Sequence, residues 1–175
     1  RFDKSSIFAD RLRYPSAVIP YDGGVYVGLE PDLIYLKDRN GDGVADFRQV
    51  VFTGFGNQRD RLDSQMFMNS LTWGLDNRIH GAKGHGGTIT PMAARDNAPL
   101  DLRNRDFSFD PRSHTMRAES DGGKQGLSFD DYGRKFVCTA NRSAGHSSSG
   151  RPAATASVSR STPEQVCLVS QAVRT

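Results

Sequence analysis

Residues 33–52 read LIYLKDRNGDGVADFRQVVF, with an apolar segment on either side of a short acidic loop. If Asp38 is counted as the first position, oxygen-bearing side chains occupy the first, third, fifth and ninth positions, and a glycine occupies the sixth. This spacing is typical of calcium-binding loops, because a hard cation takes oxygen ligands from a tightly curled backbone. The predicted ligands are the side chains of Asp38, Asn40, Asp42 and Asp46 and the backbone carbonyl of Val44.

The flanks of the loop exclude an EF-hand. The twelfth position is Gln49 rather than a bidentate glutamate, and residues 33–36 and 47–53 have the composition of strands rather than helices. The alternative to calcium is a metal-free turn, since Asp, Asn and Gly are also favoured in turns for their own backbone chemistry. In both interpretations the loop closes a β-hairpin and does not by itself define an activity.

The bulk composition predicts one globular domain. The chain has 175 residues, of which 36% are hydrophobic and 25% charged. No apolar run approaches the roughly 18 residues of a membrane-spanning helix. The net charge is only +3, and the basic residues between positions 95 and 117 alternate with aspartates, so we expect no nucleic-acid partner. The two cysteines, Cys138 and Cys167, fit no CxxCH haem motif and no metal-binding pair.

Short apolar segments separated by polar turns indicate an all-β fold. A short apolar segment, an acidic turn and a strand that contains small residues occur in this order three times. The turns contain Asp22, Asp76 and Asp130, and successive aspartates are about 54 residues apart. This spacing is typical of propeller blades, so we predict a partial β-propeller of about three antiparallel meanders over residues 1–142. Because propellers typically close with four to eight blades, we expect the ring to be incomplete.

Residues 143–175 form a low-complexity tail rich in Ser, Ala and Arg, with no aromatic residue and a single acid, Glu164. Such a segment has little with which to build a core, so we predict that it is disordered. The alternative is that it is translated out of frame. The apolar run at residues 166–169 is its one strand-like feature.

Several motifs in the same order resemble the membrane-bound dehydrogenase propeller of planctomycete and verrucomicrobial haem-binding proteins, which is similar to soluble sugar dehydrogenases that use pyrroloquinoline quinone. The resemblance covers residues 7–142. Its motifs are IFADRLRYP (7–15), GGVYV (23–27), the loop 38–46 followed by VFTGFG (51–56), NSLTWGLDN (69–77), DFSFDP (106–111) and SFDDYGRKFVC (128–138).

The resemblance implies a calcium-supported propeller outside the cytoplasm. It also implies oxidation of a sugar or polyol, with electrons passed to a quinone or haem acceptor on a segment outside this chain. Pyrroloquinoline quinone is the expected cofactor of a full-length parent, whereas this chain has no haem motif. The alternative is a non-catalytic, calcium-stabilised propeller that binds carbohydrate or a protein partner, since fold alone does not decide function.

Three further positions have candidate roles. Within the dehydrogenase hypothesis, His85 in the glycine-rich segment 80–88 is a candidate general base for a sugar or alcohol hydroxyl. The alternative is a glycine-rich loop with surface histidines. We expect His114 in an exposed turn and Trp73 in the packing of a blade.

Overall fold

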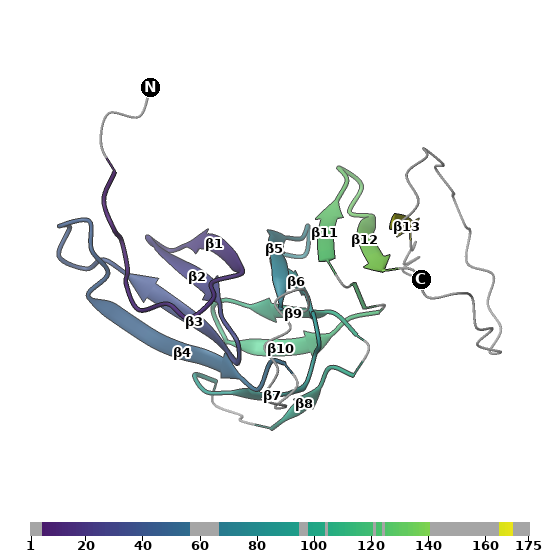
Figure 1. Cartoon of the computed structure of the whole chain (residues 1–175), viewed down its shortest axis with the longest axis horizontal. Helices are drawn as coiled ribbons and strands as arrows, with labels where there is room; N and C mark the ends of the chain where they lie inside the picture. Colours follow the sequence, from purple (N-terminus) through teal and green to yellow (C-terminus); the bar gives the residue numbers. More distant parts are fainter. Residues whose placement is uncertain are drawn as a thin grey trace.

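The computed structural model describes residues 5–56, 67–94, 98–103, 105–120, 122–123, 125–140 and 165–169, the last range and residues 138–140 as backbone only. These residues form antiparallel sheets and contain no helix (Figure 1). The predicted all-β fold class is therefore confirmed. No segment in this part of the chain has the length and apolarity of a helix that could cross a membrane.

The first sheet begins as a meander of consecutive strands. Its strands are β1 (Ala17–Tyr21), β2 (Gly24–Gly28), β3 (Asp32–Lys37) and β4 (Phe47–Thr53), followed at the edge by β7 (Thr88–Pro91) and β8 (Leu100–Asp101). β-branched and aromatic residues form the centre of β2, and β3 combines Ile34 and Tyr35 with two leucines, which suits both strands to a pleated, half-buried surface. The predicted strands on either side of the acidic loop are confirmed, because Lys37 pairs with Phe47 where β3 and β4 leave the loop.

The second and third sheets are built in the same way. The second contains β5 (Asn69–Trp73), β6 (Ile79–Ala82), β9 (Phe107–Asp110) and β10 (Thr115–Ala118), and the third contains β11 (Gln125–Phe129), β12 (Lys135–Ala140) and β13 (Gln165–Val169). β5 lies between the first and third sheets, next to β1 and β11 (Figure 1). The three meanders thus follow one another as neighbouring blades do. The β7–β8 hairpin, which leaves the second meander and joins the edge of the first sheet, was not predicted.

The 54-residue repeat corresponds to the first hairpin of each sheet. Asp22 lies in the β1–β2 turn, Asp76 in the β5–β6 turn and Asp130 at the start of the β11–β12 turn. The exact alignment of the last two aspartates is wrong by two positions. The bond from Gly74 N to Arg78 O matches the bond from Asp130 N to Arg134 O, so Gly74 is the structural counterpart of Asp130.

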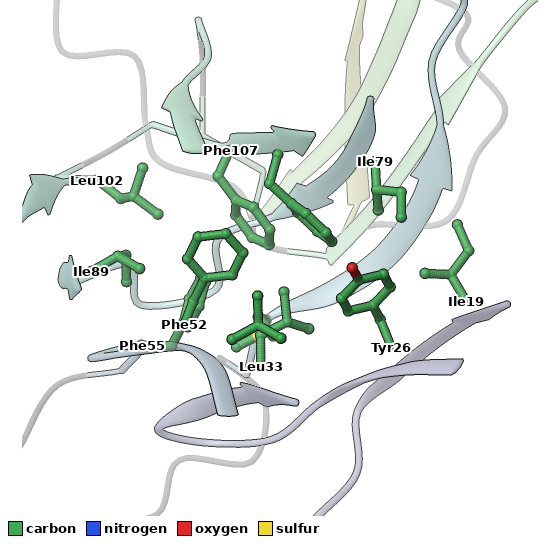
Figure 2. Packing of buried hydrophobic residues seen from close by; sticks show 12 residues of the cluster. Ile19, Tyr26, Leu33, Phe52, Phe55, Ile79, Ile89, Leu102 and Phe107 are labelled. Carbon is green, nitrogen blue, oxygen red and sulfur yellow. The ribbon is translucent and has the colours of Figure 1, made fainter. Parts of the chain in front are cut away.

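The main core lies between the first and second sheets. Figure 2 shows aromatic and aliphatic side chains meeting from both sides. Phe52 and Tyr26 of the first sheet contact Phe109 of the second at ring centroid distances of 5.3 and 5.0 Å, while Phe55 contacts Phe107 at 5.1 Å. A smaller cluster on the other face of β2 and β3 is covered by the segment that precedes β1.

Part of the predicted tail forms β13. Its backbone pairs with β12 so that Cys167 stands opposite Cys138. This strand contains the apolar run at residues 166–169, which explains why regular structure occurs there. The rest of the predicted tail, residues 143–164 and 170–175, lies outside the described residues.

Candidate functional site

A pocket of about 430 Å³ lies between the β5–β6 turn of the second sheet and the β11–β12 hairpin of the third. Its polar and aromatic lining includes Asp76, His80, Glu119, Lys135, Phe129 and Tyr132. Burial of several polar groups against aromatic rings distinguishes this pocket from the mainly apolar hollow between the N-terminal segment and β2. It is therefore the best candidate for a ligand site in the described part of the chain.

The pocket contains a carboxylate–imidazole pair. His80 Nε2 lies 3.1 Å from Asp76 Oδ1 and 3.2 Å from Oδ2. Partial burial raises the pKa of Asp76, but the hydrogen bond from His80 and that from the backbone N–H of Arg78 outweigh it, so that the pKa is lowered overall. An ionised carboxylate only accepts hydrogen bonds, so the shared proton belongs to His80 Nε2.

The second ring nitrogen of His80 has no hydrogen-bond partner in the part of the chain that the structure describes. Nδ1 is buried and has no hydrogen bond among the described residues, and the side chain as a whole is 8% exposed. With the proton on Nε2, Nδ1 of a neutral imidazole is an acceptor. Phe129 lies edge-on to the ring at 4.9 Å, so both sheets fix its position.

Gly74 allows this pair to lie against the backbone. A Cβ atom at position 74 would lie 2.5 Å from Asp76 Oδ1 and 2.7 Å from His80 Nε2. Any other residue would push the carboxylate and the imidazole away from each other or from the turn. The β5–β6 turn therefore places the pair through Gly74, to which the sequence analysis gave no role.

Glu119 reaches the pocket at the end of a chain of hydrogen bonds. Arg78 Nε donates to Ser108 Oγ at 2.8 Å, and Ser108 Oγ donates to Glu119 Oε1 at 2.5 Å. Arg78 also donates to the carbonyls of Ser108 and Thr115, and burial, followed by the charge of Arg117, lowers its pKa. Arg78 directly precedes β6, Ser108 belongs to β9 and Glu119 directly follows β10, so three neighbouring strands position one carboxylate.

Lys135 forms the opposite wall of the pocket. Its ammonium group donates to Asp106 Oδ2 at 2.7 Å and to the Ser120 carbonyl at 3.2 Å. The Asp106 side chain is fully buried, and its Oδ1 accepts the backbone N–H groups of Lys83 and Gly123. The lysine is therefore held by the protein and is poorly placed to bind an anionic ligand.

The acidic loop at residues 38–46 folds around its own side chains. Asp38 accepts the N–H groups of Asn40, Gly41 and Gly43, Asn40 accepts that of Asp42, and Asp42 accepts that of Val44. Hydrogen bonds from Gly43 and Gly41 are the leading cause of the lowered pKa of Asp38. The curled backbone predicted for this loop is thus present.

The fit of this loop to calcium is partial. Asp38 Oδ2, the amide oxygen of Asn40 and Asp42 Oδ1 each accept one N–H and keep a second lone pair, so these three residues have ligand atoms suited to a hard cation. Asp46 accepts instead from Arg39 N at 2.8 Å and Arg39 Nε at 3.2 Å, and this guanidinium would have to move before Asp46 could bind a cation. Among the described residues, no group of three or more His, Cys, Asp or Glu is arranged to hold a metal. Calcium binding therefore stays a prediction.

The pocket does not fit pyrroloquinoline quinone. That cofactor carries several carboxylates, whereas the pocket presents Asp76 and Glu119, and its one lysine is already paired with Asp106. Bringing further carboxylates beside these would be unfavourable in a partly buried site. Pyrroloquinoline quinone therefore has no suitable place in this pocket.

The other predicted positions lie elsewhere. His85 is half-buried in the 83–87 loop between β6 and β7 and does not line the pocket. His114 is in the predicted turn, but it is only partly exposed and its Nε2 lies 3.3 Å from Tyr26 Oη. Trp73 packs against Tyr21 at 6.0 Å, in line with its predicted packing role, and is 41% exposed.

The sequence analysis missed the Asp76–His80 pair, although it singled out both segments. The available signal was an aspartate in a hairpin turn followed four residues later by a histidine on the next strand. Glu119, Ser108 and Lys135 gave no local signal, because their proximity depends on how β9, β10 and β12 pack.

Fold and site together define an all-β protein built of antiparallel meanders, with a polar pocket between the second and third. The chain belongs to a family described as a domain of unknown function, DUF7133, whose model matches residues 1–174. No curated protein and no solved structure matches it.

Proposed function

We propose that the chain is the sugar- or polyol-binding part of a β-propeller, with its ligand in the pocket beside Asp76 and His80. The single observation that carries this proposal is that His80, which lines the pocket, has a buried Nδ1 with no hydrogen-bond partner among the described residues. A buried acceptor without a donor is costly, and a ligand hydroxyl would supply the missing hydrogen bond.

The rest of the lining supports the same ligand class. Sugars present hydroxyl groups around their rims and C–H groups on their faces. Asp76 and Glu119 provide acceptors for hydroxyls, while Phe129 and Tyr132 provide apolar surfaces. The resemblance to sugar dehydrogenase propellers supports a sugar or polyol independently of the pocket. By the same resemblance we propose an extracytoplasmic location and a calcium ion in the 38–46 loop that stiffens the β3–β4 hairpin.

A second candidate is oxidation of the bound sugar or alcohol. A carboxylate that orients an imidazole through one nitrogen leaves the other nitrogen able to accept a proton, as in general-base catalysis. In this candidate His80, rather than His85, accepts the hydroxyl proton. The electron acceptor, a quinone or haem, would have to be held outside this pocket and outside this chain.

Binding is tested by titrating the purified chain with glucose, sorbitol and glycerol in a calorimeter. We expect saturable binding of at least one of them by the wild type, weakened about tenfold or more in His80→Ala, which removes the imidazole, and in Asp76→Asn, which replaces the carboxylate that accepts from His80 by a neutral amide. Asp131→Asn is the matched control, since Asp131 is exposed on the β11–β12 turn. Absence of binding by a folded wild-type chain would overturn the proposal.

The enzyme candidate is tested with the full-length parent, pyrroloquinoline quinone, calcium and an artificial electron acceptor. If His80 is the base, His80→Gln should retain binding and lose most turnover. Unchanged turnover in a folded His80→Gln protein would exclude that role. If the wild type binds the sugar without turnover, only the binding function remains supported.

A further inference from the structure

We infer that Glu119 is the specificity-determining carboxylate of the pocket and that it selects amino sugars over neutral and acidic sugars. The inference rests on the proposed sugar-binding function and narrows its ligand class. It is carried by the hydrogen-bond chain from Arg78 through Ser108 to Glu119.

The chain has a fixed direction. Arg78 Nε can only donate, so Ser108 Oγ accepts from it and directs its own proton to Glu119 Oε1. Ser108 is fully buried, which prevents water from replacing either contact. Glu119 Oε1 is thereby held in one position, and its backbone N–H is fixed on the Asp106 carbonyl at 2.8 Å.

The second oxygen of Glu119 remains for a ligand. The described residues give Oε2 no hydrogen-bond partner, and Glu119 lines the pocket. His80, another lining residue, has a buried Nδ1 without a hydrogen-bond partner among the described residues, and this is an independent indication that the pocket receives a ligand. Glu119 Oε2 and the Nδ1 of a neutral His80 are both hydrogen-bond acceptors, so a ligand that binds both atoms needs donor groups.

The charges around the pocket favour a cationic donor. The described lining contains two carboxylates, Asp76 and Glu119, and one lysine, Lys135, whose charge is paired with the buried Asp106. Lys135 is held by Asp106 and Ser120, and Arg78 is buried behind Ser108, so neither cation is available to an incoming anion. A protonated amine can instead make a charge-assisted hydrogen bond to Glu119, while a uronic acid would meet a carboxylate.

The test compares glucosamine, glucose and glucuronate by calorimetric titration at about pH 7, where the sugar amine is largely protonated and an imidazole with the ordinary pKa is largely neutral. We expect the wild type to bind glucosamine about tenfold more tightly than glucose, since a charge-assisted hydrogen bond is roughly twice as strong as a neutral one, and to bind glucuronate most weakly. Glu119→Gln keeps the shape and an acceptor for Ser108, and should bring glucosamine and glucose to within about twofold of each other. Asp131→Asn should leave the preference unchanged.

The outcomes separate this inference from the proposed function. Binding of glucose without any preference for glucosamine would overturn the role of Glu119 and leave sugar binding intact. A folded Glu119→Gln chain that keeps the full preference would do the same. Absence of binding of all three sugars would overturn both proposals. The order of the three affinities in the wild type decides the inference even if the variant does not fold.

Discussion

Lys135 Nζ lies 2.7 Å from Asp106 Oδ2 in the interior between the second and third sheets. The carboxylate also accepts the N–H groups of Lys83, which follows β6, and Gly123, which precedes β11. The buried side chain of Asp106 therefore connects three segments that are far apart in sequence. Its ion pair with Lys135 attaches β12 to the second sheet.

Breaking this pair should strongly destabilise the protein. Lys135→Met keeps the length and apolar stem of the side chain but leaves the Asp106 carboxylate buried without its cation. We expect a loss of about 3–5 kcal/mol in the free energy of unfolding. Urea unfolding followed by the fluorescence of Trp73, the single tryptophan, measures it.

The double variant Asp106→Asn, Lys135→Met tests whether the cost arises from an unpaired charge. Its loss should be clearly smaller than the sum of the two single losses. Additive losses would show that the two charges do not interact in the folded protein.

Calcium should raise the melting temperature of the chain if the 38–46 loop binds it, because a ligand of the folded state stabilises that state. Asp42→Ala removes a predicted ligand and should abolish the increase. Asp131→Ala, an exposed acid on a different turn, should respond as the wild type does. A wild-type melting curve that does not change with calcium would leave only the metal-free turn.

Low pH should reduce the free energy of unfolding, because it protonates aspartates whose carboxylates accept hydrogen bonds in the turns. Burial raises the pKa of Asp130, but hydrogen bonds from Arg134 and from Tyr132 N lower it below its ordinary value of 3.8. The folded pKa lies below the unfolded one, so the stabilisation is present above the unfolded pKa and is lost as pH falls through the folded pKa.

The variant Asp130→Asn isolates this contribution. It cannot titrate at this position, so its stability should fall less steeply than that of the wild type as pH decreases through and below the ordinary aspartate range. Urea midpoints measured as a function of pH give both slopes. Equal slopes would show that Asp130 does not contribute to the acid sensitivity.

Features that depend on contacts between residues close in sequence were predictable, and features that depend on distant residues were not. The β3–β4 hairpin was predictable because its loop, from Asp38 to Asp46, is stabilised by contacts between near neighbours. The three first hairpins were predictable from their repeated turns. The two-position misalignment between Asp76 and Asp130 arose because the residues were matched by type rather than by the backbone bonds that close each turn.

The pocket was not predictable for the opposite reason. Ser108 lies between two core phenylalanines in β9, and alternation along a strand would direct it to the other face, as a surface residue. It is buried because Arg78 and Glu119 cover it, and both come from other strands. Only the assembled sheet shows that a buried serine connects them.

Gly87 should be among the least replaceable residues of the protein. Its φ of +134° lies in a region that residues with a Cβ rarely adopt, and a Cβ there would stand 2.2 Å from the Gly54 carbonyl oxygen. This contact joins the loop after β6 to Gly54, which directly follows β4. Because the contacting atom belongs to the backbone, a side-chain rotation cannot relieve the clash. We expect Gly87→Ala to lower the free energy of unfolding by roughly 3 kcal/mol or more.

Gly41→Ala is the matched control, because Gly41 has a φ of +82° but no atom within 4 Å of the added Cβ. It should cost only about 1 kcal/mol, the contribution of backbone conformation alone. The difference between the two variants in urea unfolding therefore measures the close approach of the two backbone segments. Equal losses would mean that Gly54 and Gly87 move apart without cost, and the β7–β8 hairpin would then not be anchored to the first sheet through this contact.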